Sequence, residues 1–273
     1  MMQVTRFRLL ALFFFAATLA QSQTCKSISL DSTDGVVASP ANHKVLIETD
    51  DIRVIEVTSA PHTAEKIHTH LRPAVMITDG FSTGSLIVEG QPPVMHGPSP
   101  NNKPRVVFLP PQSFHHAENL GDTPFHAIRI ELKHPGCSLS GQPAATLDAM
   151  DALTAAPLSH KVLLENADVR VLDVTVAPHT REPMHTHVWP SVMYAYQNST
   201  MRYSTPTNAG EPSAPPPNSK PAPILLKPEG LHSVENLGDT TFHAIRVEFK
   251  LANPDSPLAP STSASAPTTP AAP

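Results

Sequence analysis

The chain has 273 residues, of which 40% are hydrophobic, and a formal net charge of −5. This length accommodates two ordinary domains, and this apolar content is sufficient to build a core in each of them. The negative charge argues against nucleic acid and against an anionic membrane surface as partners.

The N-terminal segment has the pattern of a secretory signal. Arg6 and Arg8 precede an apolar run of 11 residues from Leu9 to Leu19, and small and polar residues follow. A membrane-spanning helix needs about 20 apolar residues, so this run is too short for one. We therefore expect a signal peptide over residues 1–20, no membrane span, and an exported protein, periplasmic or extracellular. Without Arg6 and Arg8, 17 basic residues face 24 acidic ones, which gives a net charge of −7.

Export bears on the two cysteines, Cys25 and Cys137. In an oxidising compartment they could form one disulfide that closes the first half of the chain. The alternative is that they are two unrelated cysteines at domain edges.

An internal repeat defines the domain organisation. Residues 43–133 recur as residues 160–250 at a constant offset of 117, with no gap, and both copies contain APHT, HTH and ENLGDT. Such self-similarity predicts two homologous domains. The remaining segments are an N-terminal extension over 21–42, a linker over 134–159, and a tail over 251–273. Because the tail consists almost entirely of Pro, Ala, Ser and Thr, it is predicted to be disordered.

Each copy reads as an all-β domain. Short stretches rich in branched residues alternate with turns that contain Pro, Gly, Asn or Asp. In the first copy these stretches are residues 44–48, 52–58, 66–70, 74–78, 85–88, 105–109, 114–118 and 125–132. The Pro-rich segments 90–104 and 206–223 are expected to be surface loops. The fold class predicted is therefore two tandem antiparallel β-barrels or jelly rolls.

Twelve of the fifteen histidines obey the offset of 117. The pairs are His43 and His160, His62 and His179, His68 and His185, His70 and His187, His115 and His232, and His126 and His243. Residues i and i+2 share a face of a strand, so the two histidines of each HTH point the same way. We expect them to bind one metal ion with a third imidazole from a neighbouring strand, His115 or His232. The alternative is that they are polar residues on an exposed sheet face.

The last hairpin of each copy suggests one more candidate. Along residues 125–132, His126 alternates in phase with Ile128, Ile130 and Leu132, which predicts that His126 faces the core. His126, and by the repeat His243, would then be a fourth ligand or a hydrogen-bond partner of a ligand. The alternative is a core histidine satisfied by backbone groups.

We expect other repeated residues to lie outside the metal site. His62 and His179 follow a proline in a turn and should be exposed, and Asn119 and Asn236 should cap the last hairpin. Three aromatic residues of the second copy replace non-aromatic residues of the first, so the two pockets should differ in polarity. The replacements are Arg72 by Trp189, Ile77 by Tyr194 and Asp79 by Tyr196.

The motifs themselves resemble those of the cupin superfamily. HTH is followed by PQSFHHAEN in the first copy and by PEGLHSVEN in the second, and the resemblance covers residues 43–133 and 160–250. Two copies would make the protein a bicupin. The resemblance implies that the following residues take the metal positions: His68, His70, His115, His185, His187 and His232.

One departure from the cupin pattern concerns the fourth ligand. Cupin enzymes usually add a glutamate three or four residues after the second histidine, where this chain has Ala74 and Val75, or Ser191 and Val192. The site is then a three-histidine site, or His126 and His243 complete it, or the metal has been lost. Glu65 and Glu182 are weaker substitutes because they lie in the preceding turn.

Two classes of function fit this sequence. The first is a metal-dependent enzyme with one divalent ion per barrel, Fe, Mn or Zn, such as the dioxygenases, isomerases and decarboxylases that the resemblance implies. No general base stands out, because Glu118 has the wrong strand parity to face the site. The second is a secreted protein that binds a metal or a small organic ligand without catalysis. A homo-oligomer is compatible with either class.

Overall fold

The computed structural model describes residues 27–97, 103–136, 149–216 and 219–250. The predicted signal peptide, the predicted tail and both cysteines lie outside the described residues. Within these ranges, no helix combines the length and the apolarity that crossing a membrane requires.

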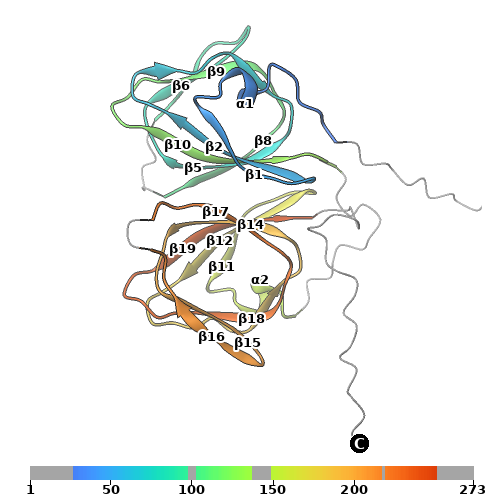
Figure 1. Cartoon of the computed structure of the whole chain (residues 1–273), viewed down its shortest axis with the longest axis vertical. Helices are drawn as coiled ribbons and strands as arrows, with labels where there is room; N and C mark the ends of the chain where they lie inside the picture. The colour runs from blue at the N-terminus through green and yellow to red at the C-terminus, as the bar shows by residue number, and fades with distance from the viewer. Residues whose placement is uncertain (1–26, 98–102, 137–148, 217–218, 251–273) are drawn as a thin grey trace, which may run out of the picture.

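The first barrel is built from two antiparallel sheets that face each other (Figure 1). One sheet has the strand order β1-β2-β10-β5-β8, and the other has the order β3-β9-β6-β7 with β4 also paired to β9. The elements are α1 (Gly35–Ala38), β1 (His43–Glu48), β2 (Ile52–Ser59), β3 (Thr63–Ala64), β4 (His68–His70), β5 (Ala74–Gly80), β6 (Gly84–Val88), β7 (Val94–His96), β8 (Arg105–Leu109), β9 (Gln112–Asn119) and β10 (Phe125–Leu132).

The second barrel repeats this architecture. Its sheets have the orders β11-β12-β19-β14-β17 and β13-β18-β15-β16. The elements are α2 (Ala152–Ala155), β11 (His160–Glu165), β12 (Val169–Val176), β13 (His185–His187), β14 (Ser191–Gln197), β15 (Met201–Thr205), β16 (Asn208–Ser213), β17 (Pro223–Leu226), β18 (Glu229–Asn236) and β19 (Phe242–Phe249). The prediction of two tandem antiparallel barrels is confirmed.

Two strands lie where the sequence predicts only loops. β7 falls inside segment 90–104 and β16 falls inside segment 206–223. Both are end strands of their sheets. A proline-rich segment can still form such a strand, because the outer edge of an end strand needs no backbone donor.

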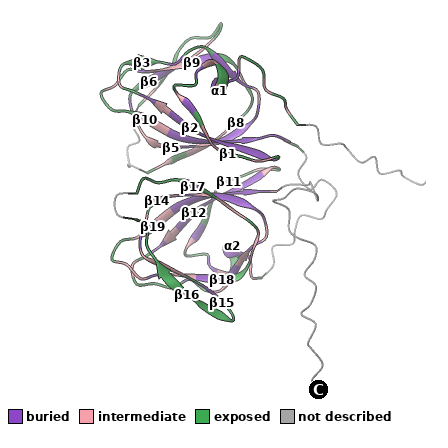
Figure 2. Ribbon diagram, in the orientation of Figure 1, coloured by how far each residue is buried: buried purple, intermediate pink, exposed green. Residues whose placement is uncertain are grey.

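The largest apolar core lies between the two barrels rather than inside either one. Figure 2 shows buried strands meeting at the middle of the molecule. The core combines residues of the β10 sheet of the first barrel with residues of the β19 sheet of the second barrel. Among them are Ile128, Ile130 and Leu132 from β10 and Val247 and Phe249 from β19. Full burial of one such side chain contributes about 1.5–3 kcal/mol, so the barrels are held together as one unit.

This core corrects the predicted orientation of β10. The alternation identifies the apolar face of the strand, but that face covers the other barrel. The opposite face points inward: Arg129 lines the cavity of the first barrel and Glu131 bonds His70. The interior is the more polar side because it contains the histidines and their partners.

His126 consequently lies on the outer face of β10, near the contact between the barrels. Its Nδ1 bonds the carboxylate of Asp79, and its Nε2 lies 3.5 Å from Glu56. The other carboxylate oxygen of Asp79 accepts a 2.5 Å hydrogen bond from the Tyr194 hydroxyl of the second barrel. Asp79 therefore forms a polar link within the largely apolar interface.

Candidate functional site

Imidazoles from β1 and β4 meet inside the first barrel. The ligand atoms of His43, His68 and His70 all lie within 4.8 Å of one another, and all three residues are buried. The two histidines of HTH share a face, as the strand periodicity predicts, and His43 faces them from the first residue of β1. In the second barrel His160, His185 and His187 form the same group.

A fourth imidazole lies against each group. β4 pairs with β9 so that His68 is opposite His115, and their ring centroids are 4.4 Å apart. The His115 ring is also 5.5 Å from that of His70. In the second barrel the His232 ring lies 4.4 Å from His185 and 5.7 Å from His187. The three predicted metal positions of each barrel are thus neighbours, joined by a histidine that the motifs did not assign.

The Nδ1 atom of every imidazole in the two clusters is bonded to an acceptor. In the first barrel the acceptors are Ser39 O at 3.2 Å from His43, Lys66 O at 2.7 Å from His68, Glu131 Oε1 at 3.2 Å from His70, and Ser113 O at 2.7 Å from His115. In the second barrel they are Ala156 O at 3.3 Å from His160, Pro183 O at 2.9 Å from His185, Glu248 Oε1 at 2.6 Å from His187, and Gly230 O at 2.8 Å from His232.

This bonding fixes the tautomer of each ring. A carbonyl oxygen can only accept, so each Nδ1 bonded to one must carry the proton. The proton of a neutral imidazole then leaves Nε2 with a free lone pair. The partners of His70 and His187 are carboxylate oxygens, which also accept. All eight rings consequently keep an acceptor nitrogen available, which is the state that a metal ligand requires.

A buried network of charges holds His70 in place. Glu131 Oε1 accepts from His70, while Glu131 Oε2 accepts from Arg53 Nη2 at 2.7 Å. Arg53 Nη2 also donates to Asp34 at 3.0 Å, and Asp34 caps the N-terminus of α1 through Val36 N. Asp34, His70 and Glu131 themselves lie within 4.8 Å of one another, but Arg53 already supplies the cation between the two carboxylates.

The second barrel contains the matching network. Glu248 bonds His187 at 2.6 Å and Arg170 Nε at 2.5 Å, and Arg170 also donates to both carboxylate oxygens of Asp151. Each barrel thus links one ligand candidate to a short helix through a carboxylate, an arginine and an aspartate.

Burial keeps His43, His70, His115 and His160 neutral. It is the main cause that lowers the pKa of His43 and of His115 to about 4 and that of His160 to about 3. For His70, burial and the nearby Arg129 outweigh Glu131 and lower the pKa to about 2. Burial would raise the pKa of Glu131, but His70, Arg129 and Arg53 together lower it to about 2. The His70–Glu131 pair is therefore a neutral donor bonded to a carboxylate.

The residues of the clusters fit a divalent metal ion. His68 Nε2 is buried and has no hydrogen-bond partner among the described residues, although burial of an unpaired acceptor is costly. Its nearest acidic atom, Glu65 Oε2, is 4.0 Å away. A metal ion would satisfy this lone pair together with those of the adjacent rings. Neutral imidazole is a good ligand for iron and zinc.

α1 packs directly on this cluster. A Cβ atom added to Gly35 would lie 2.8 Å from Cε1 of His70 and 3.0 Å from Cδ2 of His68. Only glycine allows the helix to approach the rings this closely without a shift. Ala152 occupies the matching position at the start of α2.

Each cluster opens into a cavity. That of the first barrel measures about 340 Å³ and has an apolar wall that includes Val57, Met76 and Phe125. That of the second measures about 300 Å³, and Tyr203 in its wall stacks on His232 with a centroid distance of 4.9 Å. A concave, largely apolar space with a few convergent polar groups is typical of a small-molecule site.

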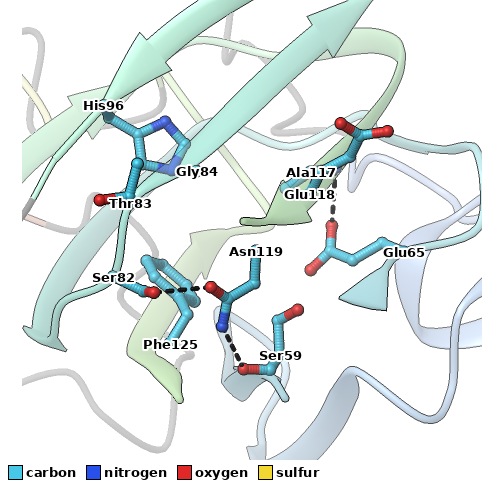
Figure 3. A pocket seen from close by; sticks show the side chains of 10 residues that line it. All are labelled: Ser59, Glu65, Ser82, Thr83, Gly84, His96, Ala117, Glu118, Asn119 and Phe125. Atoms are coloured by element: carbon cyan, nitrogen blue, oxygen red, sulfur yellow. Dashed lines mark hydrogen bonds between the residues drawn. The ribbon is translucent and has the colours of Figure 1, made fainter. Parts of the chain in front are cut away.

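Glu65 and Glu182 line these cavities, although they lie just before β4 and β13. Figure 3 shows Glu65 bonded to the backbone of Ala117, with a distance of 3.3 Å from Ala117 N to Oε2. Burial raises the pKa of each of these carboxyls to about 7, and Glu182 Oε1 lies 3.7 Å from Nδ1 of His160. Each barrel therefore places an acid that titrates near neutrality beside the imidazoles.

The remaining predicted residues lie elsewhere. His126 is at the contact between the barrels, and His243 bonds Thr175 and stacks on Tyr196, so neither joins a cluster. His62 and His179 are exposed, as expected, and bond Asp122 and Asp239. The predicted last hairpin does not form, because β9 and β10 belong to different sheets. Asn119 instead caps the turn between these strands by accepting from Gly121 N, and its amide also bridges Ser82 and Ser59 in Figure 3.

Sequence reasoning missed two pairs of site residues. His43 and His160 were recognised as repeated histidines but were not assigned to the site, because they lie on a distant strand. Asp34 and Asp151 lie nine residues before them and obey the same offset of 117. Extending the repeat upstream to these aspartates would have indicated that both short helices belong to the barrels.

Among the known proteins compared with this chain, only solved structures resemble it. No protein-family model matches the sequence, and no curated protein is significantly similar to it. Among solved structures, a protein from Pseudomonas aeruginosa named for its suspected induction by glyoxylate is 15% identical, with a TM-score of 0.51. The match covers 76% of this chain and 80% of that protein.

Two further solved structures resemble parts of this chain. A cupin domain from Bordetella pertussis is 23% identical over 33% of this chain and 90% of its own length, with a TM-score of 0.29. A salicylate 1,2-dioxygenase from Pseudaminobacter salicylatoxidans is 12% identical over 76% of each chain, with a TM-score of 0.47. At these identities the likeness concerns the fold alone. The chain has the bicupin fold that its motifs predict.

Proposed function

We propose that this chain is an exported metalloprotein in which each barrel binds one divalent ion and presents it to a small molecule in the adjoining cavity. The observation that carries the proposal is the set of eight imidazoles, four per barrel, whose Nδ1 atoms are all committed to acceptors. Such a set leaves the Nε2 lone pairs free inside the barrels, and in each barrel the ligand atoms of three of the four imidazoles lie within 4.8 Å of one another. Burial without a metal would leave His68 Nε2 unsatisfied.

An all-nitrogen ligand set narrows the choice of metal. Imidazole suits iron and zinc, whereas manganese and magnesium prefer oxygen ligands. We therefore expect iron or zinc rather than manganese. An iron ion held by these imidazoles would supply a place for dioxygen and a substrate.

The chain's own residues would support catalysis by a metal-dependent dioxygenase or a related small-molecule enzyme. The apolar wall of the cavity excludes water from the reacting groups. Glu65 in the first barrel and Glu182 in the second could hold or release a proton near neutral pH, because burial raises their pKa values to about 7. Glu131 and Glu248 keep the tautomers of His70 and His187 fixed.

The second candidate function is a binding protein without catalysis. The four imidazoles of each cluster favour it if the metal is zinc, because four ligands complete a tetrahedral zinc site and leave no position for a reacting group. The cavity would then bind a ligand beside a closed metal site.

Metal analysis of the intact protein tests the proposal. The chain is dialysed against Fe²⁺, Mn²⁺ or Zn²⁺, and its metal content is compared with those of His70→Ala, His187→Ala and the double variant. We expect two ions per chain for the original protein, one for each single variant and none for the double variant. Equal metal content in all four proteins, each shown to be folded by near-ultraviolet circular dichroism, would exclude these sites.

Dioxygen uptake then separates the two candidates. Iron-loaded protein is supplied with a panel of phenols and aromatic acids in an oxygen electrode. Turnover that is lost in the double variant supports the enzyme. Tight zinc binding with no turnover on the panel supports the binding protein.

A further inference from the structure

The two cavities have similar imidazoles but opposite charge in their walls. Three matched positions differ, each by one charge and in the same direction. Going from the first barrel to the second, Val94 is replaced by Glu211, Arg105 by Ala222 and Gln112 by Glu229. Val94, Arg105 and Gln112 line the first cavity, while Glu211 and Glu229 line the second. The two copies therefore share the candidate metal ligands but differ in the charge of the cavity wall around these ligands.

Strand geometry directs Arg105 to the first cavity. Arg105, Val107 and Leu109 alternate along β8 and all three line the cavity, whereas Val106 and Phe108 pack on the core between the barrels. Arg105 lines the cavity and is exposed, and among the described residues no carboxylate forms an ion pair with it. Its charge is available to a ligand.

The inner arginine of each barrel reinforces the contrast. In the first barrel Arg129 Nε bonds Glu131 at 3.2 Å, and its Nη1 donates to the neutral amide oxygen of Gln112 at 2.9 Å. In the second barrel Arg246 Nη1 donates to the carboxylate of Glu229 at 2.6 Å, and Glu248 lies 3.5 Å from its Nε. The guanidinium of Arg129 thus has one carboxylate partner, whereas that of Arg246 has two.

These charges act over the length of a cavity with low-dielectric walls. A cavity lined by one sign of charge concentrates ligands of the opposite sign. Arg105 makes the wall of the first cavity positive, whereas Glu211 makes the wall of the second cavity negative. The apolar part of the first wall, including Met76, Leu86 and Leu109, suits a hydrocarbon body.

We propose that the first cavity binds a small organic carboxylate, with the carboxylate paired to Arg105 and an apolar body against the wall, and that the second cavity rejects such anions. The inference rests on the proposed function, because the ligand lies in the space onto which the metal cluster opens. Beyond the proposed function, it names the class of ligand that the first barrel binds and gives the two barrels different roles.

Titration calorimetry with benzoate and with its neutral analogue benzamide tests the proposal on the full chain. The metal-free protein and the zinc-loaded protein are both used. We expect one benzoate per chain in each form and binding of benzamide that is weaker by about fivefold or more. Arg105→Ala should weaken benzoate binding about fivefold, the effect of one partly exposed ion pair, and Arg105→Lys should retain it.

Matched variants separate local charge from general effects. Arg202 is a partly exposed arginine of the second barrel that pairs with Glu235, so Arg202→Ala should leave benzoate binding unchanged. The triple variant Glu211→Val, Ala222→Arg and Glu229→Gln gives the second barrel the charges of the first. It should bind a second benzoate.

Several outcomes would overturn the proposal: no benzoate binding, two benzoates per original chain, equal binding of benzamide, or unchanged binding by Arg105→Ala. The metal content of the same samples keeps this test separate from that of the proposed function. Benzoate binding by a chain that takes up no metal would sustain the ligand class and reject the metalloprotein. Two bound ions without benzoate binding would do the reverse.

Discussion

The ring of His43 lies 4.6 Å from the ring of His68 in an edge-on arrangement, although the two residues are 25 positions apart in the sequence. His160 and His185 repeat the relationship at 4.8 Å. Both members of each pair are buried, and both have Nδ1 bonded to a backbone carbonyl. The first residue of β1 or β11 therefore belongs to the candidate metal site.

Replacement of His43 by alanine should weaken metal binding in the first barrel only. Loss of a partner that merely orients a ligand typically costs about 10- to 100-fold in affinity. Loss of the ligand His43 should cost at least the upper end of that range. Competition with a metal-chelating dye would measure the change. His62→Ala is the matched control, since His62 is exposed in the same barrel, and an equal loss in both variants would remove His43 from the site.

The Glu131 carboxylate should contribute to both metal affinity and stability. Glu131→Gln keeps the shape of the side chain but removes the charge that faces Arg53, Arg129 and His70. We expect metal affinity to fall about 10- to 100-fold. We also expect a loss of about 3–5 kcal/mol in unfolding free energy, because buried guanidinium charges lose their partner.

Chemical denaturation of the metal-free protein would measure the stability change. Glu118→Gln serves as the control, because Glu118 bonds Ser85 outside the metal cluster. A Glu131→Gln protein with the original stability and the original affinity would show that the buried network has no role.

Metal retention should extend to unusually low pH. An ordinary imidazole has a pKa of about 6.5 and loses metal to protons near that pH. Burial lowers the pKa of His43 and of His115 to about 4, so protons compete only as the pH approaches 4. The metal content of the first barrel, measured in the His187→Ala variant, should therefore remain after dialysis at about pH 5 close to that at neutral pH. Release of most of the metal near pH 6.5 would contradict the burial of the clusters.

The same shifts predict how the metal-free protein responds to acid. Because folding lowers the pKa values of His43 and His115, their contribution to stability is complete above about pH 6.5. It is lost as the pH falls from there to about 4. The unfolding free energy attributable to these residues, obtained by comparison with His43→Ala, should decline over that window.

Tyr194 should stabilise the contact between the barrels without affecting the metal. Tyr194→Phe removes the hydrogen bond to Asp79 but keeps the ring in the shared core. A hydrogen bond to a charged group contributes about 1.5–3 kcal/mol, and we expect a loss of that size in thermal or chemical unfolding. Metal content should stay at the original value. Loss of metal without loss of stability would contradict the position of Tyr194 between the barrels.

The repeat and its periodicities made the architecture predictable from sequence. HTH predicts that His68 and His70 share a face because the strand period is two residues. The turn at Gly121 and the role of Asn119 in it are also predicted, but the expected hairpin is wrong, because the strands on either side of the turn, β9 and β10, lie in different sheets. The inferences that succeed depend on neighbours along the chain or on a gap-free offset.

The parts that escaped prediction depend on which surfaces pack together. Alternation along β10 reveals an apolar face, yet it does not reveal that this face covers a second barrel, and His126 was assigned inward for that reason. His43 reaches the cluster from an edge strand, and hydrogen bonds through Arg53 and Glu131 link Asp34 to His70. These contacts span long stretches of chain, and no local spacing encodes them.

The most direct test is an anomalous diffraction map of the metal-loaded full chain at the absorption edge of the bound metal. We predict two peaks per chain, each about 2.0–2.1 Å from imidazole Nε2 atoms. One peak should lie among His43, His68, His70 and His115, and the other among His160, His185, His187 and His232. Peaks only at surface histidines such as His62, or no peak within either barrel, would contradict the account.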